Sequence, residues 1–295
     1  MRAVLLWFVA ACSFTHGSAG IAMDGSAGVR DGAPDAACAF STQLDTCGLS
    51  GTDDLTLTGA NTYDTDSGTL MMGGTPLAVT HVQLAALEGP VDAIVVHDFH
   101  MTPASSLRAT GSLPLAIVAF GAATLDGSAV IDLTAGGGGA RTSCTNGAMA
   151  GENNSGGAGG GGGGGFGAAG GDGGPGNQDG THSAGGSAGQ AAATTPRGPL
   201  GGCPGAPGGK GDENGGAGGL AGGAIYIVAK QQITLASGAI INAGGQGGGG
   251  GHQSGLDNGD AGGGGGGGVG RIRISGANAC NIASSSSPAA VTSCP

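Results

Sequence analysis

Glycine that recurs with a period of three residues is the feature that most constrains how this chain can fold. The stretch 158–176 reads AGGGGGGGFGAAGGDGGPG. Over residues 156–191, glycine fills 9 of 12 places in the phase starting at Gly156, 7 of 12 in the phase starting at Ala158, and 3 of 12 in the phase starting at Gly157. The last phase instead collects larger side chains, namely Phe166, Asp172, Pro175, Gln178, Thr181 and Gln190. This period predicts an extended helix with about three residues per turn.

Glycine is needed where such helices approach so closely that no Cβ fits between them. Two of the three faces are mostly glycine, which predicts a bundle held by hydrogen bonds from backbone N–H groups to C=O groups of neighbouring helices. Proline supplies only 12 of 295 residues, too few for collagen. The triplets of residues 156–191 and 215–223 resemble the polyglycine-II bundles of the snow flea antifreeze protein and of some glycine-rich extracellular domains. The alternative is a disordered loop, because ordering glycine costs the most backbone entropy of any residue.

The N-terminus predicts export. A single Arg follows Met1, and Ala3–Ala11 is an unbroken apolar run, too short to span a bilayer as a helix but typical of a signal peptide. Residues 9–12 read Val-Ala-Ala-Cys and resemble the bacterial lipobox. That resemblance implies cleavage before Cys12, acylation of this residue, and a stable outer-leaflet membrane anchor of several acyl chains. The alternative is ordinary secretion with cleavage near residues 17–20, which would discard Cys12.

The remaining cysteines predict disulfide bonds. They are Cys38, Cys47, Cys144, Cys203, Cys280 and Cys294, an even number in a chain expected to be exported. Six cysteines can pair in many ways, of which the simplest joins sequence neighbours: Cys38 with Cys47, Cys144 with Cys203, and Cys280 with Cys294. The second of these bonds would enclose most of the glycine tract and lower the entropy cost of ordering it. No Cys-x-x-Cys spacing supports a zinc site.

Short β-strands broken by turns are predicted between Leu55 and Ala135. The expected strands lie within residues 54–59, 80–87, 92–99, 113–120 and 128–135, with GAATLDG (121–127) as the connection between the last two. Strands recurring about every 8–12 residues indicate an all-β sandwich, barrel or solenoid. No stretch after the signal peptide has apolar residues at helical spacing.

An internal repeat favours the solenoid. Residues 117–132 (IVAFGAATLDGSAVID) align without a gap on residues 227–242 (IVAKQQITLASGAIIN), at an offset of 110 and with seven of 16 positions identical. Asp132 aligns with Asn242, which indicates a shared role in a turn. A glycine tract follows each copy, and GRIRISG (270–276) is expected to start a third. Repeats that cannot bury a face alone tend to stack.

The expected fold class is therefore all-β, a β-solenoid or β-helix-like body with glycine-rich, polyglycine-II-like insertions. The predicted parts are a lipoprotein signal peptide (1–11), a flexible tether (12–37), a β-rich repeat body (38–135), a glycine-rich insertion (136–224), a second β repeat with its glycine tract (225–277) and a disulfide-closed C-terminal tail (278–295). The formal net charge of -11 and the presence of only two lysines argue against nucleic acid as a partner and against a polybasic membrane contact.

Polar motifs point to no cofactor and no catalytic residue. His97 and His100 are three residues apart, so on one strand they would point to opposite faces, and we expect them to face solvent. The pairs Asp64 with Asp66 and Asp257 with Asp260 are calcium candidates, but neither matches a full EF-hand or a calcium-binding nonapeptide repeat. Turns capped by Asp and Asn are the alternative. The segment PGAPGGKGDE (204–213) lacks the leading glycine and the hydroxyl residue of a phosphate-binding loop.

The whole pattern resembles glycine-rich surface lipoproteins of the kind abundant in myxobacteria, and its repeats resemble those of β-helical adhesins. The resemblance implies a non-enzymatic, structural or adhesive protein of the outer membrane and cell surface. Its expected partners are the membrane through the lipid anchor, and the cell envelope, a matrix polysaccharide or further copies of itself. The alternatives are a carbohydrate-active β-helix enzyme, either a polysaccharide lyase or a glycosidase, and an ice-binding protein.

Overall fold

The computed structural model describes residues 40, 41, 43–86, 88–176, 183–191, 198–251 and 260–294. They all belong to one compact unit, Pro34–Pro295. Every regular element among them is a β-strand, as the all-β prediction requires. Accordingly, the described ranges hold no helix that could cross a membrane. The predicted signal peptide, Cys12 and the predicted tether lie outside these ranges.

The strands are short, and many have only three to five residues. In chain order they are β1 (Leu55–Leu57), β2 (Ala60–Asp64), β3 (Thr69–Met72), β4 (Thr75–Leu77), β5 (His81–Ala86), β6 (Gly89–Val96), β7 (Phe99–Met101), β8 (Ser106–Thr110), β9 (Leu115–Ala119), β10 (Ala123–Leu125), β11 (Val130–Asp132), β12 (Ile225–Ala229), β13 (Gln232–Leu235), β14 (Ile240–Asn242), β15 (Ile272–Gly276), β16 (Ala279–Ile282), β17 (Ser285–Ser287) and β18 (Val291–Ser293).

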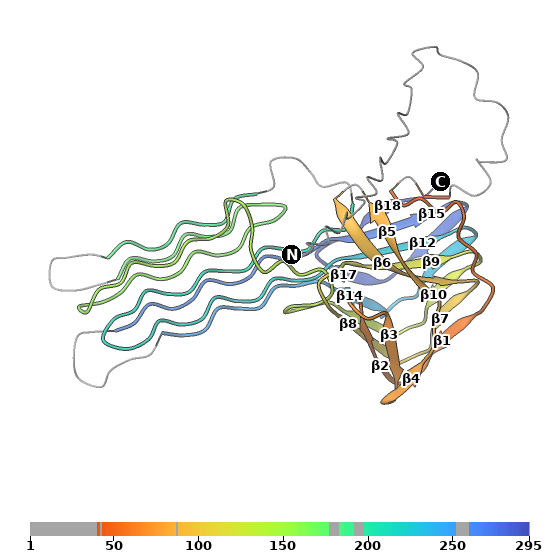
Figure 1. Ribbon diagram of the computed structural model, residues 1–295, viewed down its shortest axis with the longest axis horizontal. Coiled ribbons are helices and arrows are strands. Elements are labelled where there is room, and N and C mark those ends of the chain that lie inside the picture. Colours follow the sequence, from red (N-terminus) through yellow and green to blue (C-terminus); the bar gives the residue numbers. More distant parts are fainter. Residues whose placement is uncertain are drawn as a thin grey trace, which may run out of the picture. The chain divides into compact units, whose positions relative to one another are not determined.

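These strands form three sheets (Figure 1). Sheet 1 has the order β1-β7-β10-β13-β16, sheet 2 the order β17-β14-β11-β8-β2-β3-β4, and sheet 3 the order β18-β15-β12-β9-β6-β5. From β7 onward, consecutive strands enter sheets 1, 2 and 3 in strict rotation, so that each circuit of the chain adds one strand to every sheet. Strands of successive circuits pair in parallel, whereas the hairpins among β2, β3 and β4 and between β5 and β6 are antiparallel.

The strand register reproduces the alignment of the two repeat copies. Ile117 pairs with Ile227, Thr124 with Thr234, and Asp132 with Asn242, each at the sequence offset of 110. The segment 270–276 contains β15, which pairs with β12 and opens the next circuit. One prediction was wrong: GAATLDG contains strand β10. A three-residue strand between two corners is too short to show an alternating pattern.

Repetition of the register stacks inward-facing side chains into columns. Ile94, Ile117, Ile227 and Ile274 form one such column and are 0–1% exposed. Side chains on the outer face of sheet 3 are buried as well, in a second apolar cluster that includes Phe40, Leu44, Val118 and Val228. Strands β9 and β12 therefore read as unbroken apolar runs, because both of their faces are covered.

Two of the expected disulfides are present. Cys144 and Cys203 are bonded with their Cα atoms 5.8 Å apart, and Cys280 and Cys294 with theirs 5.9 Å apart. Cys38, one member of the third expected pair, lies outside the described residues. The predicted tail 278–295 contains β16, β17 and β18, which add a strand to each of the three sheets.

Candidate functional site

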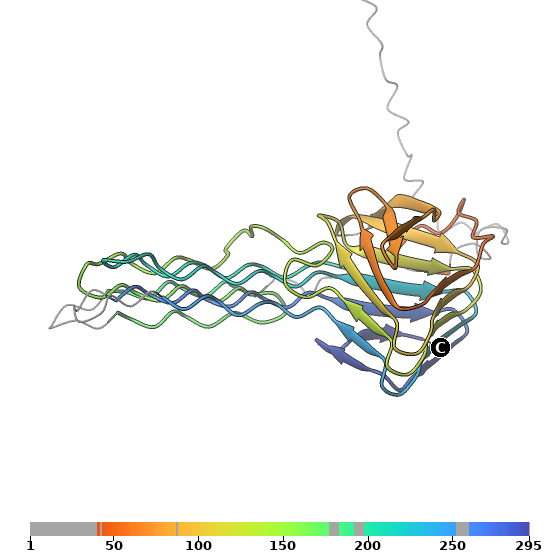
Figure 2. The ribbon, with the colours of Figure 1, turned by 90° about the horizontal axis from the view of Figure 1, so that it is seen from below.

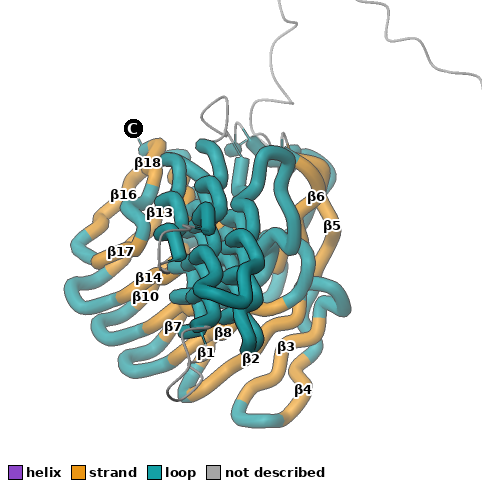
Figure 3. The backbone as a smooth tube through the Cα atoms, turned by 90° about the vertical axis from the view of Figure 1, so that its left-hand side faces the viewer, coloured by secondary structure: helices purple, strands orange, loops and turns teal. Residues whose placement is uncertain are grey.

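The glycine tracts leave the sheets at one corner of successive circuits. Both the β11–β12 link and the β14–β15 link connect sheet 2 to sheet 3, where the corresponding β8–β9 link has only residues 111–114. Figures 1 and 2 show the resulting extended segments running side by side, and Figure 3 looks along them. We call these segments the glycine bundle: residues 146–152, 158–166, 168–176, 183–191, 199–209, 215–223, 243–251 and 260–270.

Hydrogen bonds within the bundle repeat every three residues, as the triplet pattern predicts. Segment 158–166 is the clearest case. Its Gly159 and Gly162 donate to segment 146–152, Gly160 and Gly163 to segment 168–176, and Gly161 and Gly164 to segment 260–270, with N···O distances of 2.8–3.0 Å. Three successive N–H groups thus point to three different neighbours, which requires about three residues per turn.

Close approach explains why these positions are glycine. A Cβ placed on Gly161, Gly162 or Gly164 would lie 2.1 Å from a carbonyl oxygen of a neighbouring segment, far inside the closest distance that real Cβ atoms show. Segment 158–166 also accepts hydrogen bonds from segments 183–191 and 199–209. It is therefore surrounded on most sides by backbone, and no side chain fits on those sides.

The prolines of segment 199–209 also fit the three-residue pattern of hydrogen bonds. In segment 199–209, Gly205 and Gly208 donate to segment 215–223, whereas Ala206 and Gly209 donate to segment 158–166. Pro204 and Pro207 fill the third phase, where no N–H is needed. Residues 204–209 of the segment PGAPGGKGDE thus belong to one segment of the bundle.

Some glycines of the bundle face open space. A Cβ on Gly171 or Gly174 would meet nothing within 4 Å, and the same holds for Gly247 and Gly250. All four are exposed. The bundle therefore presents bare backbone along two of its outer segments, 168–176 and 243–251.

A group of titratable side chains lies on the outer face of sheet 1 and at the corner where β1 and β7 begin. His97 Nδ1 is 3.2 Å from Asp54 Oδ1 and 3.4 Å from Asp98 Oδ2. Beside it, His100 Nε2 lies 2.8 Å from Asp126 Oδ2. A groove of about 440 Å³ runs along this face, lined by Asp54, Thr56, Asp98, Phe99, His100, Ala122 and Thr124.

This grouping was only partly predictable. The His97 and His100 side chains are 47% and 40% exposed, as expected, and only His97 belongs to the three-residue group. Asp54, Asp98 and Asp126 were not among the predicted site residues. Asp54 is 43 residues before His97, and only the parallel pairing of β1 with β7 brings them together.

The calcium candidates Asp64 and Asp66 are engaged in a turn. The Asp66 N–H donates to Asp64 Oδ1 at 2.9 Å, and Asp66 Oδ1 accepts the Ser112 N–H at 2.8 Å. The hydrogen bonds from Ser112 lower the pKa of Asp66. The backbone carbonyl of Asp260 accepts a hydrogen bond within the bundle, and Asp257 lies outside the described residues. For Asp64 and Asp66, the turn interpretation is the one that the contacts support.

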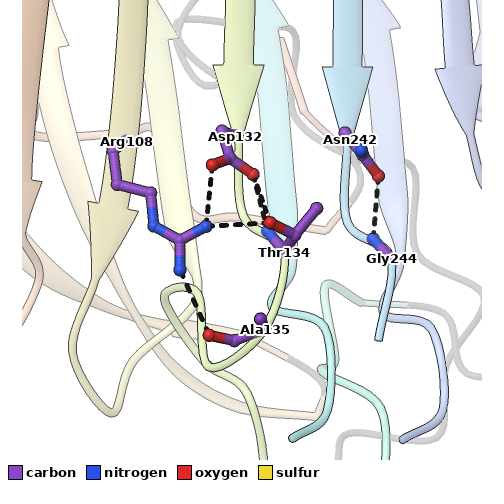
Figure 4. A network of polar contacts seen from close by, with 6 residues as sticks. All are labelled: Arg108, Asp132, Thr134, Ala135, Asn242 and Gly244. Carbon is purple, nitrogen blue, oxygen red and sulfur yellow. Dashed lines mark hydrogen bonds and ion pairs between the residues drawn. The ribbon is translucent and has the colours of Figure 1, made fainter. Parts of the chain in front are cut away.

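Asp132 and Asn242 take equivalent places at the corner where the glycine tracts begin (Figure 4). Asp132 Oδ1 accepts the Thr134 N–H at 2.9 Å, and Asn242 Oδ1 accepts the Gly244 N–H at 3.0 Å. Only Asp132 also pairs with Arg108, at 2.8 Å. Burial alone would raise the pKa of Asp132, but the hydrogen bonds from Thr134 and Arg108 outweigh it and lower the pKa.

A larger cavity of about 650 Å³ lies where the bundle begins, but few of its lining side chains could take part in catalysis or bind a charged ligand. Of its described lining residues, only Arg141 is titratable, and burial lowers the pKa of that guanidinium. Arg141 Nη2 contacts both sulfurs of the Cys144–Cys203 disulfide. A scan against protein-family models and searches of curated proteins and of solved structures find no match to this chain.

Proposed function

We propose that this protein is a non-enzymatic, lipid-anchored cell-surface protein with a structural or adhesive role. Its body would be a β-solenoid, and its glycine bundle a polyglycine-II-like element that makes the adhesive contacts. The observation that carries this proposal is the three-residue period of the hydrogen bonds in the bundle. A bundle held by its own backbone is ordered without a side-chain core, and its surface is free to interact.

Support for the solenoid comes from the strict rotation of strands among three sheets and from parallel pairing between circuits. Support for adhesion comes from the bare backbone of Gly171, Gly174, Gly247 and Gly250. Open backbone of this kind can pair with another chain in the way that an exposed strand edge does. A second copy of the bundle, the cell envelope or a matrix polysaccharide would be the partner.

The proposal of a lipid anchor is based on the lipobox-like residues 9–12 and on the apolar run before them. Mass spectrometry of the mature N-terminus tests it directly: the expected product begins at a triacylated Cys12. An unmodified N-terminus near residues 17–20 would remove the anchor and leave a secreted protein. Triacylation together with oxidised cysteines would place the protein at the outer membrane and cell surface.

Adhesion is tested with the purified full chain in detergent. We expect it to self-associate in sedimentation experiments as its concentration rises, or to bind cells or matrix polysaccharide. Joint replacement of Gly247→Val and Gly250→Val should weaken these interactions without unfolding the bundle, because both positions are open. Ala217→Val, at an exposed residue of the same bundle, is the matched control. A wild-type protein that stays monomeric and binds neither cells nor polysaccharide would refute the proposal.

The second candidate is a carbohydrate-active enzyme, and the groove on sheet 1 favours it. Paired carboxylates of inverting glycosidases are about 6.5–9.5 Å apart, and those of retaining enzymes about 5–5.5 Å. The ligand atoms of Asp54, His97 and Asp98 all lie within 4.8 Å of one another, which is closer than either arrangement, so the groove and not this spacing supports the enzyme candidate. Release of sugar ends from a polysaccharide, abolished by Asp98→Asn, would establish this function. Ice binding is a third candidate, against which the broken triplet frame argues.

A further inference from the structure

We propose that Asp54, His97 and Asp98 form a binding site for a divalent transition metal, with Zn²⁺ as the best fit. The site lies at the corner where β1 and β7 of sheet 1 begin and is separate from the glycine bundle, so it does not depend on the proposed adhesive function. Within the described ranges, no other three His, Cys, Asp or Glu side chains bring ligand atoms this close together.

The distances between the ligand atoms suit one small ion. Ligands about 2.0–2.2 Å from a tetrahedral Zn²⁺ are roughly 3.3–3.6 Å apart. His97 Nδ1 is 3.2 Å from Asp54 Oδ1 and 3.4 Å from Asp98 Oδ2. All three ligand atoms lie within 4.8 Å of one another, so one ion can contact them after the two carboxylates adjust.

The backbone around the site holds the carboxylates in place. Asp98 Oδ1 accepts the Ala122 N–H at 2.6 Å, and Asp54 Oδ1 accepts the Asp98 N–H at 3.1 Å. A Cβ at Gly121 would lie 2.0 Å from Asp98 Oδ1, so this glycine makes the space that the carboxylate occupies. Hydrogen bonds that orient the ligands are typical of metal sites, and their loss lowers affinity by about 10–100-fold.

The chemistry of the donors selects the metal. One imidazole nitrogen and two carboxylate oxygens suit Zn²⁺, whereas Ca²⁺ prefers about six to eight oxygen ligands. Asp54 and Asp98 also line the groove of about 440 Å³, so a fourth ligand can reach the ion from solvent. The excess of 20 acidic over 9 basic residues favours cation binding in general.

The test uses the full chain in detergent, stripped of metal with a chelator and titrated calorimetrically with ZnCl₂ alone. We expect one specific site, weakened by about 10-fold or more in His97→Ala and in Asp98→Asn. His81→Ala is the matched control, because His81 Nδ1 is likewise 3.2 Å from a carboxylate, that of Asp92, but belongs to no three-ligand group among the described residues. This variant should keep the wild-type affinity, and circular dichroism should show that all variants are folded.

Co²⁺ provides a second measurement that reports geometry. A tetrahedral site gives the bound ion intense visible absorption, which His97→Ala should abolish. The proposal fails if the wild-type protein does not bind Zn²⁺, or if folded His97→Ala and Asp98→Asn bind it as tightly as the wild type. Equal loss of affinity in His81→Ala would also overturn it, since the ion would then bind elsewhere.

Discussion

The β body, which comprises strands β1–β18 of the three sheets, and the glycine bundle are ordered by opposite means. In the body, side chains fill the interior, and columns such as Ile117, Ile227 and Ile274 remove apolar surface from water. In the bundle, segments lie too close for a Cβ, and backbone hydrogen bonds link the segments. The same chain therefore needs large side chains in the interior of one region and glycine at the close contacts of the other. This difference predicts that added side-chain atoms destabilise the bundle, whereas the removal of side-chain atoms destabilises the body.

The largest effect is expected from adding one methyl group inside the bundle. In Gly162→Ala the new Cβ would lie 2.1 Å from the Ser187 carbonyl oxygen, so segments must separate and lose their hydrogen bonds. We expect a cost above the ~1–3 kcal/mol typical of an overpacked core. Hydrogen exchange should show faster exchange of bundle amides with little change in the body.

Gly174→Ala is the matched control for that change, because its Cβ enters open space. It should be neutral or stabilising by about 0.4–1 kcal/mol through the unfolded chain. Equal destabilisation by the two alanines would show that close packing does not explain the glycines.

Removal of side-chain atoms from the body should lower the free energy of unfolding by nearly as much. Ile227 is fully buried between paired isoleucines of the circuits before and after it. Ile227→Ala should lower the free energy of unfolding by about 2–5 kcal/mol in denaturant titrations, because it leaves a cavity. A loss below ~1 kcal/mol would contradict the tight stacking of the column.

Removal of each disulfide bond is expected to destabilise a different one of the two regions. Cys144–Cys203 closes a loop with a sequence separation of 59, and Cys280–Cys294 one of 14. Chain entropy alone gives losses of about 4 and 3 kcal/mol when each pair is replaced by serine. Limited proteolysis should find the first variant opened within the bundle and the second near β16–β18. Cleavage of the body in the first variant would argue against this division.

The smallest effect concerns the corner where body and bundle meet. Asp132→Asn copies the residue of the next circuit and removes the ion pair with the partly exposed Arg108. At neutral pH we expect a loss of about 0.5–1 kcal/mol. The pKa of Asp132 is lower in the folded protein, so its contribution exists above the unfolded value of about 4 and disappears as the pH falls through the folded value.

Thermal unfolding of wild type and Asp132→Asn across pH 2–7 measures this difference. The two curves should converge in acid, and a constant gap at all pH values would contradict the role of the carboxylate. Asn242→Asp provides a reciprocal variant, in which a carboxylate is added to the turn of the next circuit.

Several elements of the fold could be predicted from sequence because their signals are local or periodic. The repeat offset of 110 predicted stacking of the two copies, in which Ile117, Thr124 and Asp132 pair at this same offset, and sequence neighbours predicted both described disulfides. Strand β10 was missed because its three residues carry no recognisable pattern. The group of Asp54, His97 and Asp98 was missed because Asp54 comes from a different circuit than the adjacent His97 and Asp98.

By itself, the sequence determined the three-residue period and, through it, which faces of each segment must be glycine. That result is local, because three residues per turn fix the directions of successive N–H groups. Only the tertiary structure decided the acceptors: Gly161 donates to Gly263, about a hundred residues away. The same holds for Asp54 and His97, since parallel stacking of circuits brings distant residues within 3.2 Å and no local pattern encodes which circuits adjoin.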